Sequence, residues 1–137
     1  MTRIKYDINL MKYISIFENL TRSKVKDCID DEDTLIFVVK ENEASRAIGK
    51  GGANVKKLML ILKKKIKVVE FNDDPREFIK NFIHPAKAEV REEGEDLIIE
   101  AEDKKTKGFL IGRGNQNLKK LKSIVKRYFK VNEIKVA

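Results

Sequence analysis

Two short glycine-rich stretches hold the residues of this 137-residue chain whose types and spacing could do chemistry. The first is Gly49-Lys50-Gly51-Gly52 and the second is Gly112-Arg113-Gly114-Asn115. Glycine adopts backbone dihedrals that other residues avoid and lets a ligand approach the main chain closely. A basic side chain in such a loop, together with the loop amides and the N-terminus of a following helix, favours an anion. Both stretches are therefore candidate sites for the phosphates of a nucleic acid.

The two loops belong to an internal repeat. Residues 48–58 align with residues 111–121 at an offset of 63 positions, and upstream segments match as well. Self-similarity of this kind indicates a duplicated structural unit of about 65 residues. We expect two domains, at residues 1–73 and 74–137.

The hydrophobic patterns predict the same order of elements in each half, α-β-β-α-α-β, with the glycine loop between the last two helices. In the first half we expect a helix at 7–20, strands at 24–29 and 34–40, helices at 43–48 and 53–65, and a strand at 66–71. In the second half we expect a helix at 75–83, strands at 86–92 and 96–102, helices at 105–111 and 115–129, and a strand at 131–136. The predicted fold class is α+β, with a three-stranded sheet covered by helices in each half.

Local signals sharpen several of these elements. Asp74-Pro75-Arg76-Glu77 reads as a helix start, with Asp as N-cap and Pro in the first position. Apolar residues at helical spacing predict the buried faces of two helices. These residues are Met11, Ile14, Phe17 and Leu20 in the first helix, and Val55, Leu58, Ile61 and Leu62 in the helix after the first loop.

The charge is distributed very unevenly. The chain has 30 basic and 22 acidic side chains, a net charge of +8. Residues 44–69 contain eight bases and residues 104–130 contain ten, and neither window contains an acid. Ordinary solvated helices mix both signs, so two acid-free windows point to a polyanionic partner.

Several classes of protein are disfavoured. No apolar run approaches the length needed to span a bilayer, and the first residues lack the apolar core of a signal peptide. One cysteine and one histidine cannot build a zinc site, and Cys28 is expected to be a buried apolar residue. The first loop lacks the spacing of a Walker A motif, and no nucleophile–base or paired-carboxylate motif is recognisable. We expect a cytoplasmic, monomeric protein that is not an enzyme and needs no cofactor or metal.

A G-x-x-G loop between two helices is similar to the K-homology (KH) module, which clamps a run of about four nucleotides. The additional helix and strand precede the loop, as in the type II topology of that module. The whole chain resembles the archaeal NusA-like transcription factors, which consist of two type II KH domains. The resemblance rests on residues 17–21, 25–29, 47–56, 74–79 and 109–114. It implies RNA binding linked to transcription termination or antitermination.

The candidate RNA-binding residues lie in and beside the two loops. Lys50 and Arg113 are expected to contact phosphates directly, whereas lysines in the following helices either line the RNA backbone or only raise the local field. Apolar residues beside the loops either floor a groove beneath the bases or belong to the core. The full set is Ile48, Gly49, Lys50, Gly51, Gly52, Asn54, Val55, Lys56 and Lys57 in the first half, and Ile111, Gly112, Arg113, Gly114, Asn115, Asn117, Lys119 and Lys120 in the second.

The second loop departs from the pattern because Asn115 replaces the glycine at the fourth position. Asparagine tolerates a left-handed backbone better than most residues, so the turn is expected to survive. Its side chain would crowd a phosphate, and we expect the second half to bind RNA more weakly or differently. Lys63, Lys64, Lys65, Lys126 and Arg127, near the far ends of the two helices, are expected to have a structural role that complements the helix dipoles.

Single-stranded RNA is the expected partner, with RNA polymerase or ribosomal proteins as open protein partners and no membrane. Alternative functions remain at this point: a KH protein of ribosome assembly or RNA processing, or a binder of single-stranded DNA. A protein adaptor role is compatible with either.

Overall fold

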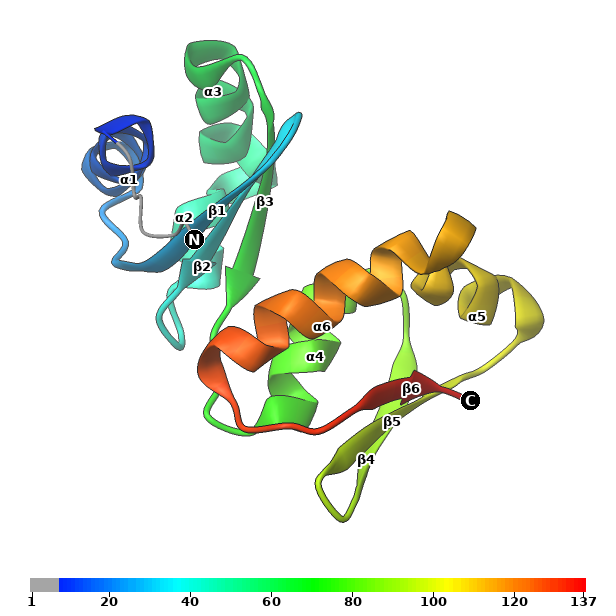
Figure 1. Cartoon of the computed structure of the whole chain (residues 1–137). Helices are drawn as coiled ribbons and strands as arrows, with labels where there is room; N and C mark the ends of the chain where they lie inside the picture. The colour runs from blue at the N-terminus through cyan, green and yellow to red at the C-terminus, as the bar shows by residue number, and fades with distance from the viewer. Residues whose placement is uncertain (1–7) are drawn as a thin grey trace. The chain divides into compact units, whose positions relative to one another are not determined.

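The computed structural model describes residues 8–137, which fold as two compact units (Figure 1). The first unit ends at Phe71 and the second is Asn72–Ala137. The first contains α1 (Ile8–Thr21), β1 (Val25–Asp31), β2 (Thr34–Val39), α2 (Ala44–Ile48), the 3₁₀ turn η1 (Lys50–Gly52), α3 (Ala53–Leu62) and β3 (Lys65–Glu70). The second contains α4 (Pro75–Ile83), β4 (Ala88–Glu93), β5 (Asp96–Ala101), α5 (Lys104–Ile111), η2 (Arg113–Asn115), α6 (Gln116–Tyr128) and β6 (Ile134–Val136). The predicted order of elements is confirmed, as is the α+β class.

The sheets of the two units have the same topology. Across residues 8–137, the strands are ordered β1-β2-β3 in one sheet and β4-β5-β6 in the other. In each, the middle strand is antiparallel to the strand before it and parallel to the last strand. The register matches too: Phe37 lies between Cys28 and Val68, and Ile99 lies between Val90 and Val136. The parallel pairing follows from the helical crossover, which contains the glycine loop.

The helices of the first unit pack on one face of its sheet. Phe17 of α1 stacks on Phe37 of β2 with ring centroids 4.2 Å apart, and both side chains are fully buried. Ala47 of α2 and Leu58 of α3 join the same apolar cluster. Fully burying a leucine or phenylalanine side chain contributes about 1.5–3 kcal/mol, so Phe17 and Leu58 hold α1 and α3 on the sheet, and the buried Ala47 lets α2 pack closely beside them. The loop between α2 and α3 is thereby held from both sides.

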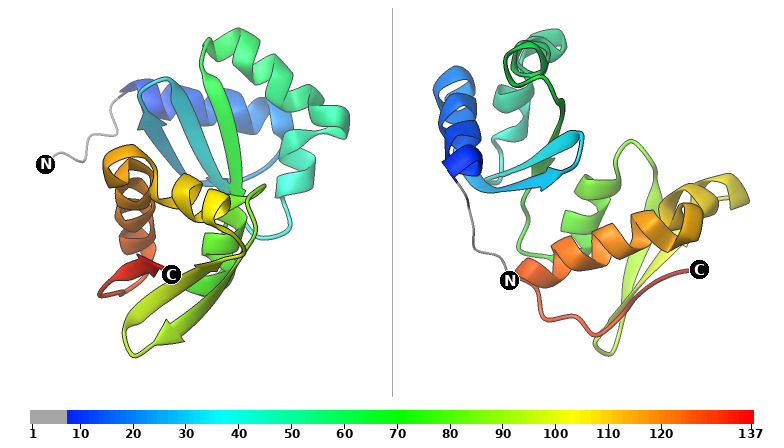
Figure 2. Two further views of the ribbon diagram at one scale, coloured as in Figure 1. Left: turned by 90° about the vertical axis from the view of Figure 1, so that its right-hand side faces the viewer. Right: turned by 45° about the horizontal axis from the view of Figure 1, so that its top comes forward.

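In the second unit, α4 and α6 lie on one side of the β4-β5-β6 sheet (Figure 2). Phe78 of α4 is fully buried, and its ring meets Tyr128 edge-on at 5.6 Å between centroids. The predicted start of α4 is confirmed, because the Asp74 carboxylate accepts a 2.9 Å hydrogen bond from the Arg76 amide. Capping satisfies an amide that the helix itself leaves free.

The ends of some elements differ from the prediction. Helix α3 ends at Leu62 because Lys63 has a left-handed backbone, with φ 57°. Lys64 therefore leaves the helix, and its ammonium pairs with Asp30 at 2.9 Å, while Lys65 begins β3. Lys64 therefore has a structural role, as expected, but it pairs with a residue of β1 instead of complementing the dipole of α3. The predicted start of the first helix, residue 7, lies outside the described residues, and β6 begins at Ile134, three residues later than predicted.

Two residues predicted to lie on buried helix faces are exposed instead. Met11 is 61% exposed and Ile61 is 53% exposed. The spacing of apolar residues shows which face of a helix is apolar, but burial also needs a neighbouring element over that face. The prediction was wrong at these two positions.

Candidate nucleic-acid interface

The two glycine loops have the same backbone conformation. Gly49 has φ 81° and ψ 165°, and Gly112 has φ 75° and ψ 172°. Two positions later, Gly51 and Gly114 both have φ 63°. These are conformations that a side chain strongly disfavours, so the glycines are required by the path of the chain.

The fourth loop position confirms the prediction for the asparagine. Gly52 has φ 76° and ψ 18°, and Asn115 has φ 64° and ψ 20°. Both residues are therefore left-handed and start the next helix in the same way. The amide of Gly52 donates to the Gly49 carbonyl at 3.0 Å, and the amide of Asn115 donates to the Gly112 carbonyl at 3.2 Å. Asparagine preserves the turn and adds an exposed side chain to it.

One asparagine in each unit holds the loop closed from inside. The Asn54 side-chain amide donates to the Arg46 carbonyl at 3.0 Å. The Asn117 side-chain amide donates to the Phe109 carbonyl at 2.7 Å. Each bond ties the helix after the loop to the helix before it. The sequence singled out both asparagines as RNA-binding residues but gave no hint of this bridging role, apart from their identical place in the repeat.

The close approach around these asparagines explains why the first loop position is glycine. A Cβ atom on Gly49 would lie 3.0 Å from the backbone nitrogen and side chain of Asn54. On Gly112 it would lie 2.8 Å from Cγ of Asn117. By contrast, a Cβ on Gly51, Gly52 or Gly114 would meet nothing within 4 Å. The first position is crowded, and the outer side of the loop is open.

The helices after the loops begin without a capping side chain. No side chain accepts a hydrogen bond from the first amides of α3 or α6, whereas α4 and α5 are capped by Asp74 and Asp103. Within residues 8–137, the amides of Lys50 and Gly51 also have no hydrogen-bond partner. Free amides at a helix N-terminus carry a partial positive charge. The arrangement suits an anion at both loops.

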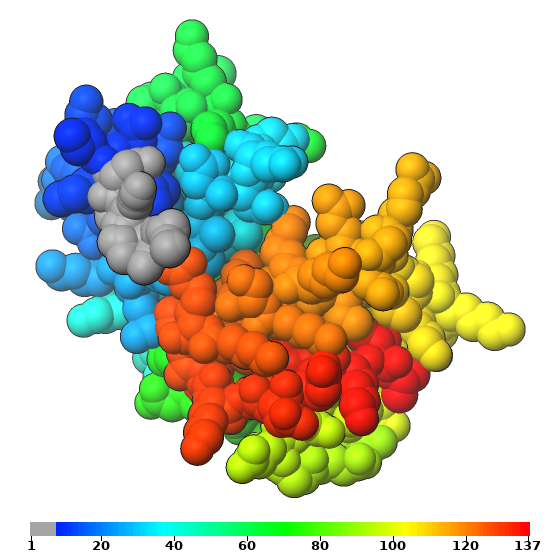
Figure 3. All heavy atoms as spheres, viewed as in Figure 1, coloured from blue at the N-terminus to red at the C-terminus, as the bar shows by residue number. Residues whose placement is uncertain are grey.

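Most bases beside the loops are exposed and unpaired. In the described part of the chain, Lys50, Lys56, Lys57, Arg113 and Lys119 form no ion pair, and all five are exposed. Long side chains in yellow and gold, the colours of residues near 105 and 115, project from the surface of the second unit (Figure 3).

The basic side chains that have acidic partners lie either farther along the helix after a loop or in the helix that precedes a loop. Lys122 pairs with Glu133 at 2.8 Å, and Arg46 lies 4.0 Å from Glu43. Lys120 is half-buried and makes contacts of its own within the fold. Of the lysines expected to face RNA, Lys120 is therefore the least available.

The apolar residues beside the loops are neither fully buried nor fully exposed. Ile48 is 37% exposed, and Val55, Ile111 and Leu118 are half-buried. Each contacts the fold with part of its side chain and leaves the rest accessible. This partial burial is compatible with both expectations, that these residues floor a groove beneath the RNA bases and that they belong to the core.

An exposed aromatic ring beside the second loop went unnoticed in the sequence. Phe109 of α5 is 60% exposed, although phenylalanine is usually buried. The equivalent residue of the first unit is Arg46. Aromatic rings stack on unpaired bases. In the sequence, the signal for Phe109 was that an aromatic residue replaces the basic Arg46 at the equivalent place beside a G-x-x-G loop.

Metal-ligand clusters and a reactive thiol are the other chemical features to consider within residues 8–137. Among the described residues, no group of three or more His, Cys, Asp and Glu could hold a metal ion. Cys28 is buried as expected, and burial, followed by the nearby Asp27 and Asp30, raises the pKa of its thiol to about 12. None of the helices in residues 8–137 is both long and apolar enough to cross a bilayer.

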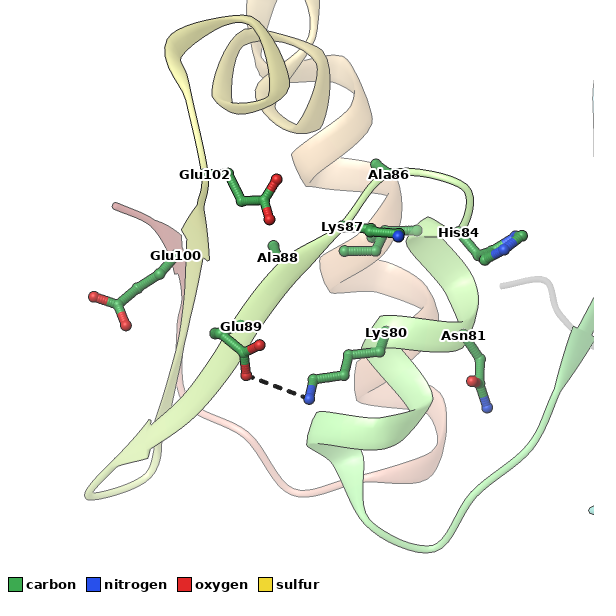
Figure 4. A pocket seen from close by; sticks show the side chains of 10 residues that line it. Lys80, Asn81, His84, Ala86, Lys87, Ala88, Glu89, Glu100 and Glu102 are labelled. Atoms are coloured by element: carbon green, nitrogen blue, oxygen red, sulfur yellow. Dashed lines mark hydrogen bonds and ion pairs between the residues drawn. The ribbon is translucent and has the colours of Figure 1, made fainter.

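A pocket of about 380 Å³ lies in the second unit, between the end of α4 and strands β4 and β5 (Figure 4). Lys80 and Glu89 face each other across it at 3.5 Å. His84 lies on its rim. No residue of the glycine loop lines this pocket, and its mixed charges select no single class of ligand.

Comparison with known proteins agrees with the geometry of the loops. Residues 12–73 match the family model described as KH domain. A probable transcription termination protein NusA from Methanocaldococcus jannaschii is 31% identical, over 99% of this chain and 76% of that protein. Its counterpart from Methanococcus vannielii is 36% identical, over 98% of this chain and 80% of that protein.

A solved structure is similar as well. The crystal structure of APE1850 superposes with a TM-score of 0.72 and 35% sequence identity, covering 93% of this chain and 96% of that chain. The first unit therefore contains a KH domain, and the chain belongs to the family of archaeal NusA-like proteins.

Proposed function

We propose that this chain is a single-stranded RNA-binding factor that acts in transcription termination or antitermination through two type II KH domains, residues 1–73 and 74–137. Its relatives bear the name of a transcription termination protein, and the KH model matches the first half. KH modules bind single-stranded nucleic acid through the G-x-x-G loop.

The observation that carries the proposal is the repeated loop. The same backbone angles, the same bridging asparagine and the same uncapped helix occur in both units. Residues 48–58 and 111–121 are identical at seven of eleven positions, and the shared backbone conformation adds structural support to that similarity. It supports a second KH domain in residues 74–137, beyond the segment 12–73 that the KH model covers.

In the proposed mechanism the loops hold the sugar-phosphate backbone. Lys50 and Arg113 contact phosphates, and the free amides of the helix N-termini strengthen the local positive field. Lys56, Lys57 and Lys119 extend that field along the helices. The bases turn toward the partly accessible apolar residues next to the loops.

The two domains are proposed to contribute differently. The Asn115 side chain narrows the outer side of the second loop, which weakens its hold on a phosphate. Phe109 offers a ring on which a base can stack, a contact worth about 1–3 kcal/mol. We therefore assign phosphate contact mainly to the first loop, and a stacking contribution to the second.

The effect on transcription follows from holding RNA extended. A nascent transcript kept single-stranded cannot form a hairpin in the held segment, which alters pausing and release. RNA polymerase is the protein partner that this role implies, and the cytoplasm is where the two would meet.

The test is fluorescence anisotropy with short single-stranded RNA, matched single-stranded DNA and duplex RNA at several salt concentrations. Two variants disrupt equivalent loop positions: Lys50→Asp/Gly51→Asp and Arg113→Asp/Gly114→Asp. The matched control is Lys87→Asp/Gly94→Asp, because Gly94 also has φ 63° with open space around it but lies outside the loops. Each lost phosphate contact should make the log–log salt slope less steep by about 0.7.

The expected result is a preference for single-stranded RNA that the first loop variant abolishes, the second reduces and the control leaves intact. If salt-sensitive binding survives both loop variants, the basic side chains attract RNA only through a nonspecific positive field. That result would contradict the proposal. A preference for DNA would replace RNA as the ligand.

A further inference from the structure

The outer side of α3 exposes apolar side chains beyond the loop. Met59 is 42% exposed, Leu60 is 78% exposed and Ile61 is 53% exposed. An exposed leucine alone needs no explanation, but three adjacent exposed apolar residues on one short helix do.

Lysines frame this apolar surface. Lys56 and Lys57 lie one helical turn before Leu60, and Lys63 lies one turn after it. All three are exposed and form no ion pair within residues 8–137. We call Met59, Leu60 and Ile61, with these three lysines, the α3 surface.

The second unit provides an internal comparison for the α3 surface. At the repeat positions of Met59 and Leu60, α6 has Lys122 and Ser123. The isoleucine is retained as Ile124, but there it is buried, with 3% exposure. The lysines at positions 56, 57 and 63 are all matched in α6, by Lys119, Lys120 and Lys126. The basic residues are thus common to both units, and the exposed apolar residues belong to the first alone.

We propose that the α3 surface is a docking site for an acidic amphipathic helix of a partner protein. Such a helix would place apolar side chains at i, i+3, i+4 and i+7 against Met59, Leu60 and Ile61. Aspartates and glutamates along its flanks would pair with Lys56, Lys57 and Lys63. The charge of the surface selects an acidic partner, and the apolar centre supplies the anchor.

Two other occupants suit the surface less well. RNA is held by basic side chains that contact its phosphates and by aromatic rings on which its nucleobases stack, whereas Met59, Leu60 and Ile61 are aliphatic. The second unit also retains the loop and the lysines without the apolar residues. A second copy docking through the same surface would bring like-charged lysines together, which opposes a symmetric dimer.

The proposal is tested with the double variant Met59→Lys/Leu60→Ser, which copies the residues that α6 carries at these positions. The substituted residues already occur in a folded helix of the same repeat, so α3 is expected to form. The reciprocal control, Lys122→Met/Ser123→Leu, places the apolar pair on α6. Circular dichroism and RNA anisotropy establish that each variant is folded and keeps its loops.

The probe is a phage-displayed library of helical peptides of about 18 residues, five turns, with randomised surface positions. It is selected on the full chain and counter-selected on the Met59→Lys/Leu60→Ser variant. We expect enriched peptides rich in aspartate and glutamate with apolar residues at helical spacing. Their affinity for the double variant should be at least about tenfold weaker.

Three outcomes would overturn the proposal. The first is enrichment of basic or uncharged peptides, or no enrichment over the variant. The second is a loss of RNA affinity in Met59→Lys/Leu60→Ser comparable with that of a loop variant, which would assign the surface to RNA. The third is sedimentation showing a dimer of the full chain that the variant abolishes, which would make a second copy the occupant. The proposal is independent of the loop function, because the peptide selection contains no RNA.

Discussion

Replacing the glycine at the first position of a loop by alanine should destabilise the protein more than replacing the glycine at the third position. Both positions have positive φ, 81° at Gly49 and 63° at Gly51. They differ in the space around them. A Cβ on Gly49 would lie 3.0 Å from the backbone nitrogen of Asn54, whereas a Cβ on Gly51 would meet nothing within 4 Å. The pair of variants therefore separates steric crowding from backbone strain.

The expected magnitudes follow from these two contributions. At Gly51, left-handed strain costs about 1–2 kcal/mol, offset by about 0.4–1 kcal/mol because alanine restricts the unfolded chain. The net loss is about 1 kcal/mol. Gly49 lies in a region open almost only to glycine, at a cost of about 1–3 kcal/mol. Displacing Asn54 also loses its bond to the Arg46 carbonyl, about 1 kcal/mol, and with the same offset from the unfolded chain the net loss is about 2 kcal/mol.

The assay is urea unfolding followed by circular dichroism, with amide hydrogen exchange in α3 and α6 to assign each effect to its unit. Gly112→Ala should cost at least as much as Gly49→Ala, because its Cβ would lie only 2.8 Å from Asn117. Gly94→Ala is the control for strain alone, with φ 63° outside the loops. Equal losses for Gly49→Ala and Gly51→Ala would refute the reasoning, since crowding against the asparagine would then have no energetic effect.

Three further predictions follow from single residues. Asn115→Gly removes a side chain without changing the backbone, so RNA affinity measured with the first loop disrupted should rise roughly threefold, about 0.7 kcal/mol; an unchanged or lower affinity would contradict it. Asp74→Ala should cost about 1 kcal/mol near neutral pH in urea unfolding, because α4 loses its cap. Hydrogen bonds from the side chain and then the backbone of Arg76 lower the pKa of Asp74. Its stabilisation is therefore present above the unfolded-state value of 3.8 and lost as pH falls through the lower folded-state pKa, so the gap from wild type should close in acid. A gap that persists in acid would mean that the carboxylate is not its cause. The Cys28 thiol, buried and with a raised pKa, should react with a thiol reagent at least about a thousandfold more slowly than in the urea-unfolded chain. Rapid labelling of the folded protein would show that β1 opens.

Local rules explain why much of the structure could be predicted. Asp74 before Pro75 marks a helix start because the carboxylate caps the helix wherever the helix lies. Asn115 keeps the turn because the cost of a left-handed residue depends on that residue alone. Each of these outcomes depends on a few neighbouring residues, so the sequence is sufficient to predict them.

Burial was harder to predict, because it depends on residues distant in the chain. Ile61 and Ile124 occupy the same place in the repeat, yet Ile61 is 53% exposed and Ile124 only 3%. Both isoleucines follow a buried leucine at the same spacing, Leu58 and Leu121, although Met59 and Leu60 of α3 are replaced by Lys122 and Ser123 in α6. The difference comes from what packs against α3 and α6, which is set by the whole of each unit.

The sequence by itself determined that the chain is a duplication, that each half has the order α-β-β-α-α-β, and that basic glycine loops join two helices in both halves. Periodicity, caps and left-handed residues act over a few positions, which is why these features can be seen before folding. Only the tertiary structure decided that Asn54 and Asn117 bridge the helices around each loop, that Phe109 remains exposed, and that Lys64 pairs with Asp30. These are contacts between segments brought together by the packing of the sheet and its helices, and no local pattern specifies such contacts.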